Sequence, residues 1–184
     1  MSRLSSALTL AALPLALAVA SGCGSGASAH TVSATAYHSS ICRGTDRWSS
    51  DAHRPYFTMK GLALQFKYGS PTQSGTRTKE ISATAGLAAA TERLRKAEEA
   101  AGIPRINHGS DYAREVVAAT QELERSFQHL HDEAEGLSSA GGPASQSALL
   151  EPQMSAALEK FAQRVKAARS RYDVSFAGCG TSSS

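Results

Sequence analysis

Residues 111–137 read DYAREVVAATQELERSFQHLHDEAEGL and carry the clearest helical pattern in the chain. Apolar and small residues recur there in steps of four and three: Val116, Thr120, Leu123, Phe127, Leu130, Ala134 and Leu137. This spacing lines up one side of an α-helix for packing against a neighbouring helix. Ser110 and Asp111 supply a cap and an acidic first turn. We therefore predict an amphipathic helix over these residues.

Two further helices are predicted, one before and one after this segment. Residues 78–101 are rich in alanine and end at Gly102, a residue that commonly terminates helices, shortly before Pro104. The last helix starts within residues 147–152, and its stripe is Leu150, Met154, Leu158, Phe161, Val165, Ala168 and Tyr172. Short connections favour antiparallel neighbours. The predicted fold is mainly α, an up-down-up three-helix bundle over residues 79–179.

Charge supports the pairing of the second and third of these helices. Residues 111–137 hold seven acids and two bases, whereas residues 160–171 hold five bases and no acid. An antiparallel arrangement would bring those bases close to Glu115, Glu122 and Glu124. Exposed ion pairs contribute only about 0–1 kcal/mol each, but they favour this register.

The segment before the bundle, residues 41–78, has an irregular pattern. Phe57 and Met59 alternate with polar neighbours, and so do three later residues: Leu64, Phe66 and Tyr68. Gly61 breaks the phase between the two sets. Alternation of this kind is typical of extended chain. We predict two short strands, or one extended segment with a kink, that packs along a groove of the bundle.

The N-terminus shows the features of an export signal. Arg3 is followed by an apolar stretch over residues 7–20 and by the small residues Ser21 and Gly22 before Cys23. This segment resembles a bacterial lipoprotein precursor, and the resemblance covers residues 1 to about 25. It implies cleavage after Gly22, removal of residues 1–22, and a thioether-linked diacylglycerol on Cys23. An ordinary secretory signal with an incidental cysteine is the alternative. A transmembrane helix would need about 20 apolar residues.

The remaining domain boundaries follow from composition. Residues 23–40 are mostly small and polar and read as a flexible tether that carries the lipid. Residues 180–184 read as a disordered tail. The mature chain is long enough for a single domain with its own core.

Cysteine parity suggests one cross-link. If Cys23 carries lipid, Cys42 and Cys179 remain, and disulfides persist in exported proteins. A bond between these two would close a loop of nearly the whole domain. Two free thiols, or an intermolecular bond, are the alternatives.

A basic segment offers the one candidate contact surface. Residues 31–78 hold six basic and two acidic residues, among them Arg43, Arg47 and Arg54 around Trp48. This segment could contact anionic lipid or an anionic wall polymer, or it could be a solvated connector. Trp48 could stack on a ligand or anchor an unknown protein partner. The interpretation favoured for Trp48 is that it caps a pole of the bundle beside Cys42.

Motifs for catalysis or metal binding are not found. The sequence HLHDEAE, residues 129–135, is dense in polar groups, but His129 and His131 point to nearly opposite sides of a helix. GxSxG, SxxK, HExxH and glycine-rich phosphate loops are absent. We expect no metal and no cofactor. The net charge of +3 is too small to indicate nucleic-acid binding.

These observations predict a location more sharply than an activity. We expect a lipid-anchored module on the extracytoplasmic face of the cell membrane, which binds a partner or supports the cell envelope without enzymatic activity. The alternatives are a carrier of a small ligand or metal, and an extracytoplasmic hydrolase.

Overall fold

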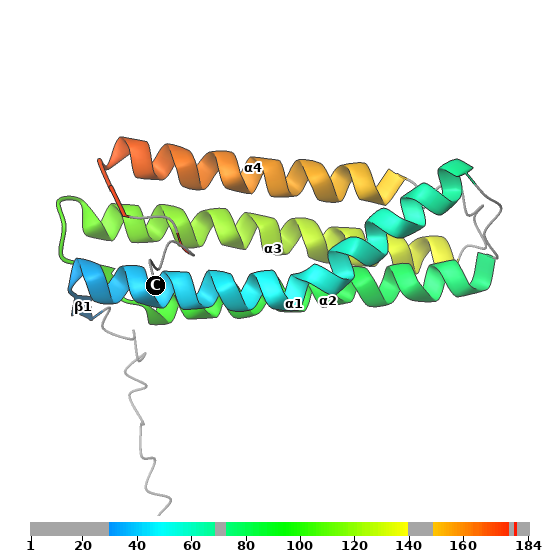
Figure 1. The fold of residues 1–184 in the computed structure, drawn as a ribbon, viewed down its shortest axis with the longest axis horizontal. Coiled ribbons are helices and arrows are strands. Elements are labelled where there is room, and N and C mark those ends of the chain that lie inside the picture. Colours follow the sequence, from blue (N-terminus) through cyan, green and yellow to red (C-terminus); the bar gives the residue numbers. More distant parts are fainter. Residues whose placement is uncertain (1–29, 69–72, 140–148, 177–178, 180–184) are drawn as a thin grey trace, which may run out of the picture.

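The computed structural model describes residues 30–68, 73–139, 149–176 and Cys179. It contains four helices, α1 Ala34–Tyr68, α2 Gln73–Ala100, α3 Gly109–Ser139 and α4 Leu150–Arg171. They run up, down, up and down in one elongated bundle (Figure 1). The prediction of a mainly α chain is confirmed, and its last three helices lie close to the predicted ranges. The prediction of three helices is wrong, because a fourth precedes them. The signal peptide 1–22, Cys23 and the tail 180–184 lie outside the described residues.

The added helix, α1, replaces the predicted tether and extended segment. The described part of residues 23–40 contains a short strand, β1 Thr31–Val32, and the first two turns of α1, and most of residues 41–78 are helical. Ser33 caps α1, because its Oγ accepts a hydrogen bond from the backbone N–H of Ala36 at 3.1 Å. The buried residues of α1 are Tyr37, Ala52, Met59 and Leu62. By contrast, the residues that suggested alternation include Leu64 and Tyr68, which are exposed.

Pro55 lies inside α1 and divides it. Proline removes a helical hydrogen bond and bends the axis. In Figure 1 the second half of α1 leans towards the start of α4. An ion pair of 3.9 Å between Lys60 Nζ and Glu151 Oε1 joins these two parts. Gly86 of α2 gives the proline ring its space, because a Cβ at that glycine would lie 2.9 Å from Pro55 Cγ.

Each helix packs mainly on its neighbour in the sequence. Two acids of α3 form ion pairs with α4. The carboxylate of Glu122 pairs with Lys160, whose Nζ lies 2.5 Å from Glu122 Oε1, and with Arg164. The carboxylate of Glu115 pairs with Arg171. These contacts agree with the predicted pairing. The expectation for Glu124 is wrong, because its carboxylate accepts Arg95 Nε of α2 at 2.6 Å.

Two clusters of buried residues fill the bundle. The larger cluster is central, and its most buried large side chains are Met59, Leu87, Leu123, Phe127, Leu150 and Met154. The smaller cluster joins Tyr37 of α1 to Ala101, Tyr112, Val116 and Ala168. None of the described helices is both long and apolar enough to cross a membrane.

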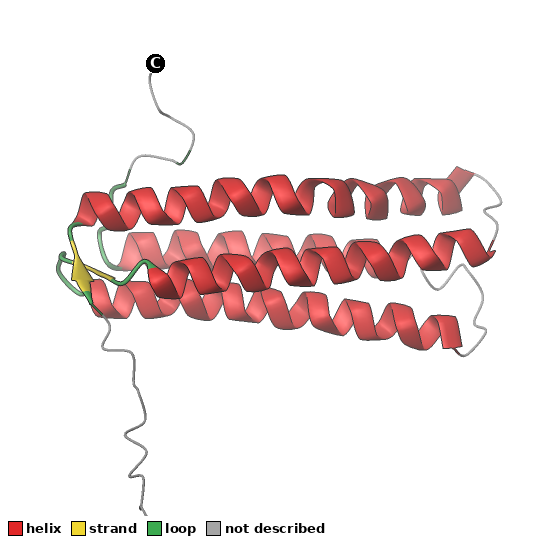
Figure 2. Ribbon diagram, turned by 90° about the horizontal axis from the view of Figure 1, so that it is seen from below, coloured by secondary structure: helices red, strands yellow, loops and turns green. Residues whose placement is uncertain are grey.

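A small parallel sheet closes the pole where α1 begins. Thr31 and Val32 of β1 pair with Ile103 and Pro104 of β2 (Ile103–Pro104), as Figure 2 shows. Gly102 has a φ of +81°, which confirms its predicted role in ending the preceding helix. A Cβ at this position would lie 2.5 Å from the carbonyl oxygen of His30.

Candidate functional site

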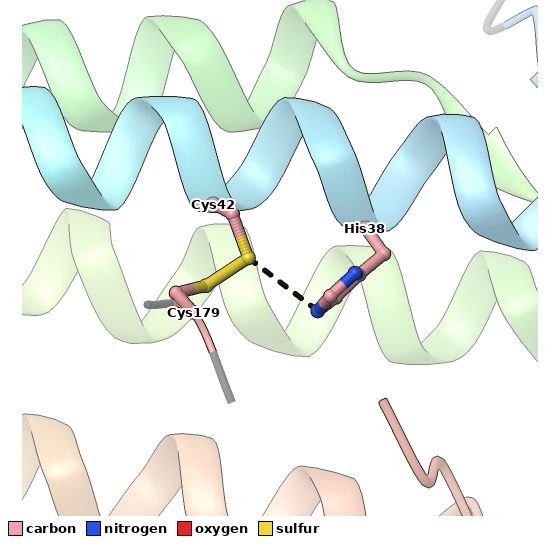
Figure 3. The surroundings of a disulfide bond; sticks show 3 residues. All are labelled: His38, Cys42 and Cys179. Carbon is pink, nitrogen blue, oxygen red and sulfur yellow. Dashed lines mark hydrogen bonds between the residues drawn. A yellow bond between two sulfur atoms is a disulfide. The ribbon is translucent and has the colours of Figure 1, made fainter. Parts of the chain in front are cut away.

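The cross-link between Cys42 and Cys179 ties the C-terminal segment to α1 (Figure 3). It is the pairing that cysteine parity favoured. His38 lies one turn before Cys42, with its Nε2 3.4 Å from Cys42 Sγ, and its ring stacks on Phe176 at a centroid distance of 5.0 Å. The C-terminal segment is therefore held by a covalent bond and by aromatic packing.

The same three side chains form a group with the composition of a metal site. One ligand atom from each of His38, Cys42 and Cys179 lies within 4.8 Å of the others. Thiolates bind metals, however, and here both sulfur atoms are bonded to each other. In this oxidised form the group serves as a structural link.

Trp48 and the nearby arginines point in different directions. Arg43, Arg47 and Arg54 are exposed, whereas Trp48 turns inwards. Its indole N–H donates to Thr91 Oγ1 of α2 at 3.1 Å, and its ring lies 6.5 Å from that of Phe161 of α4. The predicted position at a pole beside Cys42 is wrong, because Trp48 lies within α1 and packs against the central core cluster of the bundle.

The arginines continue into an apolar stripe that the sequence interpretation missed. Phe57, Leu64 and Tyr68 are 55%, 57% and 76% exposed, respectively. A step pattern of four and three connects them to the arginines along one side of α1: Arg43, Arg47, Ser50, Arg54, Phe57, Gly61, Leu64 and Tyr68. We call these eight residues the outer face of α1. The pattern was present in the sequence, but it could be found only by assuming a helix.

The outer face is positively charged. Helix α1 holds five basic residues and two acidic ones, and Asp51 is paired with Arg93 of α2 at 2.9 Å. Within the described residues, Lys60 is the one cation of α1 at ion-pair distance from an acid. A hydrogen bond with Tyr56 raises the pKa of Lys60, so this side chain is cationic at neutral pH. The charge of this helix is therefore available to an outside partner.

A shallow apolar groove borders the outer face at Phe57. It has a volume of about 260 Å³ and runs between α1, α2 and α4. Trp48, Ala52, Tyr56, Leu87 and Leu158 contribute to its walls. A groove of this composition suits a small apolar group.

A buried acid near the β1 pole was also missed. Glu98 is 4% exposed, and its Oε2 has no hydrogen-bond partner among the described residues. Burial raises the pKa of Glu98 to about 8, although a hydrogen bond from Thr120 opposes this shift. Glu98 is four residues after Leu94 and three before Ala101, so it occupies an inward position of its helix. That spacing was the available signal.

The polar residues of 129–135 lie on different sides of α3. His129 is exposed, whereas His131 is half-buried and its Nδ1 lies 3.3 Å from Thr84 Oγ1 of α2. His129 pairs with Glu133 at 3.4 Å, and His131 pairs with Glu135 at 3.5 Å. These two pairs do not converge on a common position within the described part of the chain.

No family model, curated protein or solved structure matches this chain.

Proposed function

We propose that the protein is an exported, lipid-anchored helical module that acts by binding at the outer side of a membrane. The observation that carries the proposal is the N-terminal pattern, an apolar stretch over residues 7–20 followed by Ser21, Gly22 and Cys23. A signal peptide with this ending supplies both export and a thiol for lipid attachment. Two or more acyl chains give stable anchoring.

The short chain length between the proposed lipid site, Cys23, and the first described residue, His30, is consistent with binding at a membrane surface. His30, the first described residue, follows Cys23 by seven positions. A chain of that length reaches at most about 25 Å. The pole that carries β1 would therefore stay near the lipid, and α1 starts at that pole.

One feature of the described surface supports binding as the mode of action, and the disulfide supports export. The outer face of α1 presents apolar and cationic side chains together, the composition of a contact surface. An oxidising compartment outside the cytoplasm also suits the Cys42–Cys179 bond.

The anchor is tested by replacing Cys23 with alanine. We expect Cys23→Ala to abolish lipid labelling and to move the protein out of the membrane fraction. Ser21→Ala is the matched control, because it keeps a small residue before the cysteine and should remain membrane-bound. Equal retention of wild type and Cys23→Ala after a high-salt wash would contradict the proposal.

A carrier of a small apolar ligand is the second candidate, favoured by the groove beside Trp48. A ligand there should change the fluorescence of Trp48, the only tryptophan in the chain. Ala52→Leu would fill the groove and should abolish that change. A signal that is the same in Ala52→Leu as in wild type would place the ligand elsewhere.

A further inference from the structure

We infer that the outer face of α1 lies flat against an anionic membrane surface, with its apolar half entering the interfacial layer and its arginine half at the headgroups. The inference deepens the proposed function and depends on it for the presence of a membrane. Its occupant is a lipid surface rather than a protein partner.

The geometry of the outer face suits a flat surface. Its eight positions span residues 43–68, which corresponds to at most about 38 Å, because Pro55 bends the helix axis between the two halves. Arg43, Arg47 and Arg54 fill one half, and Phe57, Leu64 and Tyr68 fill the other. A Cβ at Gly61 would meet no atom within 4 Å, and the three large side chains of this half are each more than half exposed, so the described chain leaves most of this half uncovered. One side of a single helix therefore forms a continuous, uncovered surface.

Charge selects an anionic partner. From residue 52 to residue 68 the helix contains no acidic residue. The carboxylate of Asp51 is already paired with Arg93, which leaves Asp46 as the one acid of α1 without an ion pair to a described residue. Basic side chains next to a membrane are attracted by anionic headgroups, each adding to the affinity.

The side chains that flank the apolar half are those found at membrane interfaces. Lys60 Nζ lies 5.3 Å from the ring centroid of Tyr56, and Lys67 Nζ lies 5.2 Å from that of Tyr68. Lysine can bury its aliphatic stem while its charge stays at the headgroup level. Tyrosine combines an apolar ring with a polar tip and favours the same layer. Helices of this kind lie in the interface with the apolar side buried.

A second copy of the chain fits this surface less well than lipid. Two outer faces brought together would bring two sets of unbalanced cations into one contact, and like charges disfavour association. An anionic bilayer supplies negative groups and an apolar layer at once. Anchor and surface would also act together, because the tether enters α1 through β1 and the lipid at Cys23 would raise the local concentration of the outer face.

The test uses the lipid-free chain that starts at residue 24. This chain keeps every described residue, so it retains both core clusters and the Cys42–Cys179 bond. Helical circular dichroism and a cooperative thermal transition verify its fold. Binding is measured by co-sedimentation with two kinds of vesicle. The neutral vesicles are pure phosphatidylcholine, and the anionic vesicles also contain about 30% phosphatidylglycerol by weight, which makes their surface strongly anionic.

Two triple variants separate the contributions of charge and apolar contact. The charge variant is Arg43→Gln with Arg47→Gln and Arg54→Gln. The apolar variant is Phe57→Gln with Leu64→Gln and Tyr68→Gln. The matched controls introduce glutamine at exposed residues elsewhere, Arg105, Arg125 and Lys166 for charge, and Ala162 with Ala167 of α4 for apolar contact.

We expect wild type to bind anionic vesicles and the charge variant to bind them about 100-fold more weakly, at roughly fivefold for each of the three arginines. The apolar variant should lose a comparable fraction, and both controls should bind as wild type does. Binding should weaken between 0.1 M and 1 M salt, because the screening length shortens from about 10 Å to about 3 Å.

Three outcomes would overturn the inference. They are no binding to anionic vesicles, equal losses in the controls, and binding that neither triple variant changes. Concentration-dependent dimerisation that the apolar variant abolishes would assign the surface to a second copy instead. Failure here leaves the anchor proposal intact, because the reagent lacks Cys23. Failure of Cys23→Ala to release the protein leaves the vesicle result intact.

Discussion

The indole nitrogen of Trp48 donates a hydrogen bond to the hydroxyl oxygen of Thr91 at 3.1 Å. Thr91 in turn donates to the carbonyl oxygen of Leu87, one turn earlier in α2, at 2.9 Å. The Trp48 ring also lies near that of Phe161 of α4. One side chain therefore joins the first helix to the second and the fourth, and it explains why an aromatic residue stands among the arginines of α1.

Removal of this hydrogen bond should lower stability. We expect Trp48→Phe to reduce the free energy of unfolding by about 1 kcal/mol, because a typical buried hydrogen bond contributes that much. Urea denaturation followed by circular dichroism measures the change. Thr91→Ser is the control, since it keeps the hydroxyl and should cost less than Thr91→Val. If Thr91→Val, which keeps the shape of the side chain, is as stable as wild type, the hydrogen bond contributes nothing measurable.

The contact between Gly86 and Pro55 predicts opposite effects for two glycine substitutions. In a helix, alanine is favoured over glycine by up to about 1 kcal/mol. At Gly86 the new methyl group would lie 2.9 Å from a rigid proline ring, so we expect Gly86→Ala to be destabilising. At Gly136 a Cβ meets no atom within 4 Å, so Gly136→Ala should be stabilising. Thermal unfolding measures both, and a gain in Gly86→Ala would mean that Pro55 moves away freely.

Glu98 should make stability depend on pH. Its pKa is about 8 in the folded chain and about 4.5 when exposed, so the folded state holds a proton that the unfolded state releases between these values. The contribution of Glu98 to the free energy of unfolding should therefore be most favourable below about pH 4.5, and it should decrease as the pH rises towards 8. The loss should reach a few kcal/mol at most, at about 1.4 kcal/mol per pKa unit.

Glu98→Gln should flatten this dependence and raise stability at pH 8. Glu159→Gln, a change of an exposed carboxylate on α4, is the control and should keep the wild-type profile. Urea titrations at pH 5, 6, 7 and 8 compare the three proteins, a series chosen to cover roughly the window between the two pKa values. A wild-type profile unchanged by Glu98→Gln would show that Glu98 is ionised and solvated.

The disulfide should contribute strongly to stability. The bonded cysteines are 137 residues apart, and the chain-entropy model gives roughly 4–5 kcal/mol for a loop of that size. We expect Cys42→Ser with Cys179→Ser to unfold at a distinctly lower urea concentration than the oxidised wild type. Under reducing conditions the two proteins should converge. Recovery of two alkylatable thiols from the folded, unreduced protein would contradict the cross-link.

The three later helices could be predicted because their patterns are local. The inward stripe of α3 is a regular series that includes Leu123, Phe127 and Leu130, all buried in the structure. Gly102 marks the end of α2 because a left-handed backbone there favours glycine. Such signals require only the neighbouring residues along the chain.

Helix α1 was missed because its inward and outward sides carry similar residues. Its buried side includes the small Ala52, while Phe57 and Leu64 of the outer face are larger and more conspicuous. Pro55 and Gly61 inside the helix also resemble the punctuation of a loop. Packing against α2 and α4 decides which apolar residues of α1 are buried. The residues next to α1 in the sequence do not show where those two helices will lie.

The three later helices and the cysteine pair thus follow from residue order, since a period and a parity are properties of contiguous sequence. The anchor signal is also read from contiguous residues, and it stays a prediction. The inward turn of Trp48, the burial of Glu98 and the exposure of Phe57 follow from packing. Thr91, Phe161 and Gly86 lie more than 25 residues away from the α1 side chains that they contact, and only the assembled bundle brings them together. Burial depends on which helices pack around a residue. For this reason the two aromatic residues differ, with Trp48 packed into the core and Phe57 exposed.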